Sequence, residues 1–250
     1  NWGELYNHMK KILFSIIRTF FGFIFSLFGK RVLKNKITIF NFHEVSHDPS
    51  EFLRAYDLNI NPDVFNFQIN FIVNNFNVIT PDDLIKGNLK ENSALITFDD
   101  GFKGVFQNAI PILTKHNASS VIFLNMSVIK GETFWAGIIT YLCKYEDKFI
   151  NHLHKNKILN QNKALFLYCD VQLVNSFIKK YGIYNKRELL NYIGEFASFE
   201  ELKIADEING VHYGNHLDNH YVSLNLKNAE LIDSYKKNEK LLSKFHSKVN

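Results

Sequence analysis

The chain contains one apolar run that shows no helical period and ends on two carboxylates. It reads Ser-Ala-Leu-Ile-Thr-Phe from Ser93 to Phe98, and Asp99, Asp100 and Gly101 follow directly. A run of this kind is typical of a strand that is buried on both faces of a parallel sheet. In parallel α/β folds the carboxyl ends of the strands carry the chemistry, so this stretch predicts both the fold class and the place of a site.

The doubled carboxylate has two interpretations. Taken alone, Asp99-Asp100-Gly101 is more typical of a turn whose acidic side chains are solvated. Two adjacent carboxylates also repel each other unless a cation or a shared proton relieves them. The second interpretation is a functional site in which a cation or a shared proton relieves this repulsion. It depends on which polar side chains follow the other predicted strands.

Strand and helix signals alternate along the chain. Helical patterns over Phe65–Phe76 and Val105–His116, the second interrupted by Pro111, separate apolar runs, and this rhythm implies parallel pairing with right-handed crossovers. We therefore predict an α/β fold. Its parallel sheet is expected to hold five strands: Ile37–Phe42, Asn77–Thr80, Ala94–Phe98, Val121–Leu124 and Val211–Tyr213.

Composition and patterning indicate one main domain. Helical patterns dominate residues 134–209, so we expect a domain over residues 36–250 with a helical insertion there, preceded by a separate segment over residues 1–35. A hydrophobic share of 46% is typical of a globular protein, and a net charge of +4 without a charge block does not imply nucleic acid. Cys143 and Cys169 lack both disulfide-framework and metal-ligand spacing.

The segment Ile12–Phe28 is apolar except for one stripe at helical spacing, and basic residues flank it. No small-residue cleavage site of a secretory signal follows it, and Arg18 near its middle disfavours a spanning helix. The pattern fits a helix that lies in a membrane interface and equally a helix packed on its own domain. It is therefore compatible with a membrane-associated or a cytoplasmic protein. The stripe consists of Ser15, Arg18, Thr19, Gly22 and Ser26.

Three predicted strands end on side chains that can bind a metal. His43 ends the first, Asp99 and Asp100 follow the third, and His216 and His220 follow the last. Two histidines four residues apart can reach one ion, and a carboxylate from a neighbouring strand would complete a set of three. Such a set leaves positions open for water and substrate, as in catalytic metal sites.

These residues resemble the polysaccharide deacetylase (NodB-homology) family. Its first signature is similar to Thr97-Phe98-Asp99-Asp100-Gly101, and its second, a histidine pair of the same spacing, to His216–His220. The resemblance extends from Ile37 to Leu242. Further stretches match one bacterial branch of the family: Asn41–Val45, Val78–Leu84, Phe134-Trp135, Phe199–Leu202 and Gly214–His216.

The resemblance implies a deformed (β/α) barrel that removes N-acetyl groups from the amino sugars of a glycan, using a divalent metal that is most often zinc. By position, Asp100, His216 and His220 would be the metal ligands and Asp99 the general base. Contact with substrate, or support of the ligands, is expected from three further residues: His43, Asn215 and Trp135.

The chain departs from the family pattern in two places. Leu217 stands where the family has Ser or Thr, a hydroxyl that helps to fix the loop. The family's later strands, with its general acid, would follow Asn250, so we expect a partial barrel with its first and last strands near unpaired edges and with low turnover. A non-catalytic metal- or carbohydrate-binding protein and a membrane-tethered structural domain are the alternative interpretations.

If Ile12–Phe28 lies in a membrane interface, its apolar side needs a lipid partner. We expect the chain to co-sediment with liposomes and to lose this property when the residues before Lys36 are deleted. Equal sedimentation of both forms would favour packing on the domain.

Overall fold

The computed structural model describes residues 36–132, 134–156, 169, 171–182 and 185–249. The segment Ile12–Phe28 lies outside these residues, so its predicted helix is not described. Among the helices of the described ranges, none is both long and apolar enough to cross a membrane.

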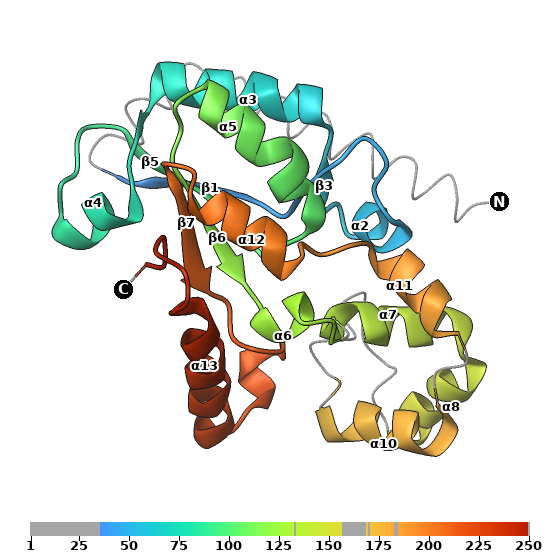
Figure 1. Cartoon of the computed structure of the whole chain (residues 1–250). Coiled ribbons are helices and arrows are strands. Elements are labelled where there is room, and N and C mark those ends of the chain that lie inside the picture. Colours follow the sequence, from blue (N-terminus) through green and yellow to red (C-terminus); the bar gives the residue numbers. More distant parts are fainter. Residues whose placement is uncertain (1–35, 133, 157–168, 170, 183–184, 250) are drawn as a thin grey trace.

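A parallel sheet organises the fold (Figure 1). Its strands follow the order β1-β5-β6-β7, and β4 pairs with the start of β5. This arrangement confirms the predicted α/β fold with a parallel sheet of about five strands, and β1 and β7 lie at the ends of the order as predicted. The strands are β1 (Thr38–Phe42), β4 (Asn77–Val78), β5 (Ser93–Phe98), β6 (Ser120–Leu124) and β7 (Val211–Asn215).

Short pairings complete the sheet structure. A separate parallel pair joins β2 (Glu44–Val45) to β3 (Asn59–Ile60). Beside β7, Tyr213 forms a bridge to Lys248, with Tyr213 N donating to the carbonyl oxygen of Ser247. The outer side of β7 is therefore not wholly unpaired, in contrast to the open edge expected from the sequence.

Helices α3 (Pro62–Asn75) and α5 (Ile110–Lys115) lie side by side over the sheet (Figure 1). Helix α3 begins with Asn61 as its N-cap and Pro62 in its first turn, and it buries Phe65, Ile69 and Ile72 at the spacing of one helical face. Helix α5 directly follows the π-helical turn η1 (Val105–Ala109), and Pro111 lies in its first turn. Proline is tolerated there because it has no backbone N–H to donate to a preceding helical turn.

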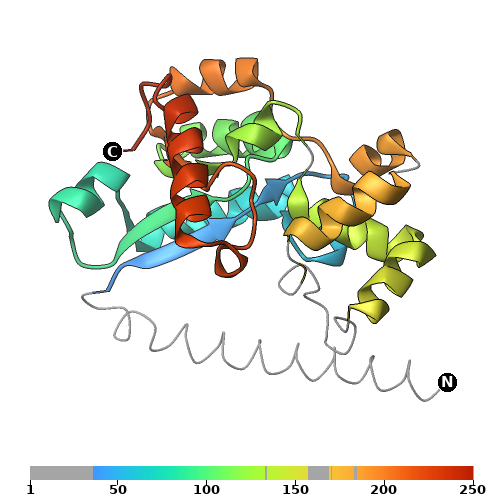
Figure 2. The same ribbon diagram turned by 90° about the horizontal axis from the view of Figure 1, so that it is seen from below.

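Two short helices begin with capping boxes. In α4 (Pro81–Lys86) the box joins Thr80 to Asp83, and in α12 (Phe199–Asp206) it joins Ser198 to Glu201. Helix α13 (Asn228–Leu242) follows β7 and packs against it. Figure 2 shows this helix, in red, from below. Short helices α2 (Glu51–Ala55), α6 (Met126–Ile129) and η2 (Ser223–Asn225) connect the larger elements.

A second group of helices lies beside the sheet, between β6 and β7 in the sequence (Figure 1). It has its own buried cluster, which includes Phe149, Val174 and Ile193, and Phe196 packs against both this cluster and the main core, which joins the sheet to α3 and α5. The group consists of α7 (Trp135–Tyr145), α8 (Asp147–Lys155), α10 (Val171–Tyr181) and α11 (Lys186–Ile193).

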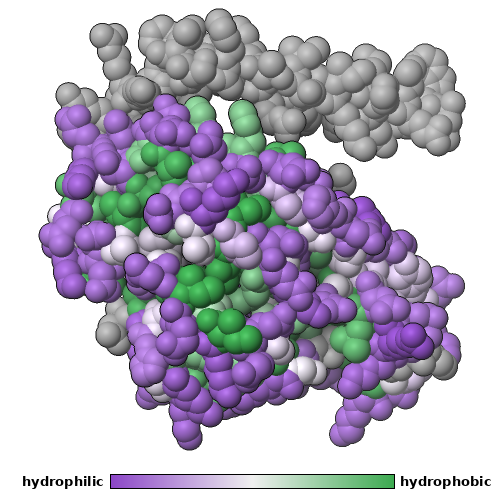
Figure 3. Space-filling view, turned by 45° about the horizontal axis from the view of Figure 1, so that its top comes forward, coloured by the Kyte–Doolittle hydropathy of each residue, from purple (hydrophilic) through white to green (hydrophobic). Residues whose placement is uncertain are grey.

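The surface is largely hydrophilic, with apolar side chains reaching it in places (Figure 3). Among the large hydrophobic residues that are exposed, Val64, Phe67 and Phe71 lie on the outer side of α3.

Glu44, in β2, carries a buried carboxyl group, with 5% of the residue's surface exposed. Its two oxygens accept hydrogen bonds from Val45 N (2.7 Å) and Gly104 N (3.3 Å). A Cβ at position 104 would overlap Glu44 Oε1, so only glycine allows this approach. Burial raises the pKa of Glu44 to about 7 in spite of the two backbone donors.

We expect Glu44 to make the folded state less stable as pH rises. The folded protein keeps the proton above the ordinary pKa of 4.5, so the free energy of unfolding should fall between pH 4.5 and about 7, by up to about 3 kcal/mol. Glu44→Gln should remove this part of the pH dependence. Urea unfolding of both proteins across this range measures it, and identical slopes would contradict the prediction.

Candidate metal centre

The parallel sheet brings three sets of polar side chains to one edge. His43 follows β1, and Asp99 and Asp100 follow β5, which pairs directly with β1 in matching register. His216 follows β7, which is separated from β5 by β6. The loop His216–His220, called the His loop below, therefore reaches across the end of β6 to meet β5.

Left-handed backbone conformations turn the chain at both places. Asp100 has a φ of 72° and Gly101 one of 83°, while Leu217 and His220 in the His loop have φ values of 64° and 55°. Residues other than glycine adopt this backbone conformation at a cost of about 1–2 kcal/mol each. Strain of this kind persists only where the surrounding structure fixes it, and it concentrates at functional sites.

Asp100, His216 and His220 converge on one point. Asp100 Oδ1 lies 3.0 Å from His220 Nε2 and 3.4 Å from His216 Nε2. One ligating atom from each residue falls within 4.8 Å of the others. Asp100 is 2% exposed, and its Oδ1 has no hydrogen-bond partner among the described residues.

The charges at this cluster depend on each other. Burial alone would raise the pKa of Asp100, but the two imidazole rings hold that pKa well below its usual range. Burial would likewise lower the pKa of His216, and the neighbouring Asp100 carboxylate raises it instead. The cluster is therefore a buried anion that requires positive charge beside it.

Asp99 faces a different set of partners, although it adjoins Asp100. Its Oδ2 accepts a hydrogen bond from Asn41 Nδ2 at 2.9 Å and lies 3.7 Å from His43 Nε2. Thr97 Oγ1 donates to Asn41 Oδ1 at 2.8 Å and fixes that amide. Asp99 keeps partial contact with solvent, so the two carboxylates can play different parts.

The other predicted residues take supporting positions. Trp135 is buried in α7 and packs edge-on against Tyr221, which follows the His loop, with ring centroids 5.0 Å apart. It does not join the Asp100 cluster. Asn215 lies at the base of the His loop, where its Oδ1 accepts a hydrogen bond from Leu217 N at 3.0 Å.

Sequence reasoning missed several residues that shape the site. Asn41 lies on β1, two residues before His43, and Asn125 directly follows β6 as Asp99 follows β5. A polar residue directly after a buried strand was the signal that could have identified Asn125. The ring of Phe134, with its centroid 4.8 Å from that of His220, closes one side of the cluster.

A second group of metal-binding residue types lies elsewhere, formed by Asp206, Glu207 and His246. The oxygens of Asp206 accept hydrogen bonds from the backbone N–H groups of His246 and Ser247 at 2.9 and 2.8 Å. These bonds tie the segment after α13 to α12, which is a sufficient reason for the grouping.

Comparison with protein families identifies the chain. The family model for polysaccharide deacetylases matches residues 86–249, a range that contains Asp99, Asp100 and the His loop. The chain belongs to the polysaccharide deacetylase family. Comparison with curated proteins gave no significant match.

Solved polysaccharide deacetylase structures are similar to this one. A polysaccharide deacetylase from Bacillus cereus shares 15% identity at a TM-score of 0.52, over 85% of this chain and 49% of that one. The deacetylase PplD of Streptococcus pyogenes, in complex with acetate, shares 16% identity at a TM-score of 0.46, over 84% and 70%. IcaB from Ammonifex degensii shares 15% at 0.48, over 83% and 68%.

At these identities the similarity concerns the fold alone. The evidence for the shared fold is the similarity to the Bacillus cereus structure, at a TM-score of 0.52. This chain spans about half the length of that protein. The fold of a polysaccharide deacetylase is thus present in the described residues.

We expect Gly101→Ala to destabilise the protein more than Gly87→Ala. Both glycines have left-handed backbones, with φ values of 83° and 71°. A Cβ at Gly101 would lie 2.7 Å from Leu124 Cδ2, whereas a Cβ at Gly87 would meet nothing within 4 Å. The shared strain is about 1–2 kcal/mol, and overpacking should add about 1–3 kcal/mol at Gly101.

Chemical denaturation measures the loss of stability in each variant. The loss in Gly87→Ala gives the backbone strain that both substitutions share, so the difference between the two losses gives the overpacking at Gly101. Equal losses of stability would show that the turn at Asp100 has room for a side chain.

Proposed function

We propose that this protein is a metal-dependent carbohydrate N-deacetylase that hydrolyses N-acetyl groups on the amino sugars of a glycan. Two observations support the proposal. The chain belongs to the polysaccharide deacetylase family, and its sheet edge joins a carboxylate and two imidazoles within 4.8 Å. The convergence of Asp100 with His216 and His220 is the observation that carries it.

The donor set fits a divalent cation. Asp100 Oδ1 is buried without a hydrogen-bond partner among the described residues, and two imidazole nitrogens lie 3.0 and 3.4 Å from it. A buried anion of this kind is stabilised by a cation held jointly with neutral imidazoles. Two histidines and one carboxylate are ligands that suit Zn²⁺, and three protein ligands leave a position for water or substrate.

The two carboxylates have separate roles in this proposal. Asp100 would hold the ion together with His216 and His220, and a bound divalent ion polarises a carbonyl and lowers the pKa of water. Asp99 is not part of the ligand set, and Asn41 fixes its Oδ2 through a hydrogen bond of 2.9 Å. We assign Asp99 as the general base that accepts a proton from the attacking water.

His43 supports the base. Its Nε2 lies 3.7 Å from Asp99 Oδ2, and His43 directly follows strand β1, which pairs with β5 in register. Together with Asn41 it confines the Asp99 carboxylate, so that the oxygen that is to accept a proton has a defined direction. Such orientation of a base by neighbouring groups is a common source of catalytic efficiency.

Substitution of the two aspartates should separate metal binding from chemistry. We expect Asp100→Ala to abolish zinc uptake measured by calorimetry, because it removes the one anionic ligand. Asp99→Asn should retain zinc uptake and lower acetate release from N-acetylglucosamine oligomers by about 10²–10⁴-fold, the usual contribution of a general base.

His246→Ala is the matched control, since His246 belongs to the second group of metal-binding residue types and contributes its backbone N–H there. It should change neither measurement. Zinc uptake by Asp100→Ala would contradict the ligand assignment. Zinc and glycan binding without acetate release by the parent protein would favour the non-catalytic alternative.

A further inference from the structure

The backbone of the His loop is hydrogen-bonded at every position from His216 to Asp218, although it belongs to no helix or strand. The three N–H groups donate to Leu124 O (3.2 Å), Asn215 Oδ1 (3.0 Å) and Ser234 Oγ (2.9 Å) in sequence order. The three carbonyl oxygens accept from Asn125 Nδ2, from Asn125 Nδ2 again (3.0 Å) and from Ser127 N (3.3 Å).

Asn125 provides the link to β6. It is fully buried directly after that strand, and its side-chain amide donates to the carbonyl oxygens of both His216 and Leu217. One amide group therefore fixes two successive peptide planes, the first of which belongs to a predicted ligand. A carboxylate in its place could not donate to either oxygen.

Asn238 provides the link to α13, and it is also fully buried. Its Nδ2 donates to Leu124 O at 2.7 Å and to Asn215 Oδ1 at 2.8 Å, and its Oδ1 accepts from Met126 N at 2.8 Å. It thus joins the end of β6 to the end of β7 and uses both donors of its amide.

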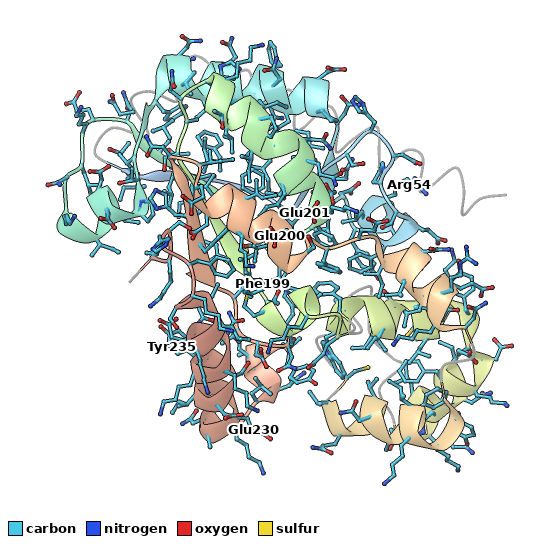
Figure 4. All side chains as sticks on the ribbon, viewed as in Figure 1. Arg54, Phe199, Glu200, Glu201, Glu230 and Tyr235 are labelled. Atoms are coloured by element: carbon cyan, nitrogen blue, oxygen red, sulfur yellow. The ribbon has the colours of Figure 1, made fainter. Side chains whose placement is uncertain are left out.

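Asn215 connects Asn238 to the His loop by hydrogen bonds. Its Oδ1 accepts from Asn238 and from Leu217 N, while its Nδ2 donates to the carbonyl oxygen of Tyr235 and to Glu239 Oε2, both at 3.1 Å. Tyr235 lies on α13, as Figure 4 shows. The orientation of the Asn215 amide is therefore fixed from the helix, and with it the peptide N–H of Leu217.

The loop needs such support because it is strained. Leu217 and His220 both adopt left-handed backbones, which are unfavourable for their side chains. Leu217 also has no hydroxyl group with which to bond its own loop. The buried amides of Asn125 and Asn238 supply the hydrogen bonds that fix the backbone of this stretch.

We propose that Asn125 and Asn238 are positioning residues that hold the His loop so that His216 and His220 face Asp100. This inference rests on the proposed function, because the positioned histidines act by binding metal. Neither asparagine is placed to touch the ion or the substrate. Groups that orient metal ligands from behind typically change metal affinity by about 10–100-fold when they are removed.

The test compares Asn238→Leu and Asn125→Asp with the parent protein. Asn238→Leu keeps the side-chain volume and removes both donors, and Asn125→Asp keeps the shape and removes its donor. Zinc affinity is measured by competition with a chelating dye. Amide hydrogen exchange of residues 215–219 is measured separately without metal. Each variant should weaken zinc binding about 10–100-fold and speed exchange in these residues at least about tenfold.

Asn108→Leu is the matched control. The Asn108 amide donates to the carbonyl oxygen of Val45 at 2.7 Å, so this variant loses a comparable bond away from the His loop. It should leave zinc affinity and loop exchange unchanged within about threefold, even if the protein unfolds more easily.

Three outcomes overturn the proposal. If the asparagine variants bind zinc as the parent does, with unchanged loop exchange, the network only attaches α13 to the sheet. The same conclusion follows if the control weakens zinc binding equally. If the parent protein takes up no zinc, the metal assignment under the proposed function fails, and loop exchange decides the positioning role on its own, faster exchange supporting it and unchanged exchange overturning it.

Discussion

A carboxylate buried against two imidazoles is the contact around which this structure is built. Asp100 lies at the end of the fully buried strand β5, and its low pKa depends on His216 and His220. For the two histidines to reach it, the chain must cross the end of β6 in a strained loop, and the turn at Asp100 must admit a left-handed backbone. Gly101 allows the turn after Asp100, and the hydrogen bonds of Asn125 and Asn238 hold the loop.

Asp99 and Asp100 are adjacent in the chain after β5, but their carboxylates lie in different environments. Asp100 points into a closed cluster with two histidines, whereas Asp99 contacts Asn41 and stays partly open to solvent. Both residues follow the last residue of β5, and the left-handed turn at Asp100, with a φ of 72°, directs the two side chains to different partners. Two carboxylates that would repel each other in a plain turn are thereby separated, as the proposed roles of ligand for Asp100 and base for Asp99 require.

Local signals explain what the sequence could predict. The apolar run Ser93–Phe98, the helical pattern over Phe65–Phe76 and the break at Pro111 each depend only on neighbouring residues, so their elements were found close to their observed bounds. The network behind the His loop joins residues far apart in the sequence. Asn238 looks like any polar residue of a helix until α13 is packed against β7, and no pattern in the sequence marks that contact.

The dependence of the His loop on α13 has a consequence for synthesis on the ribosome. Asp100 and both histidines emerge before α13 does, because that helix follows them in the chain. Until α13 docks, the amide of Asn215 has neither Asn238 nor the Tyr235 carbonyl to orient it, and the left-handed turn at Leu217 keeps its bond from Asn125 without the support from α13. The nascent chain therefore carries all three side chains of the proposed metal site in advance of the geometry that brings them together.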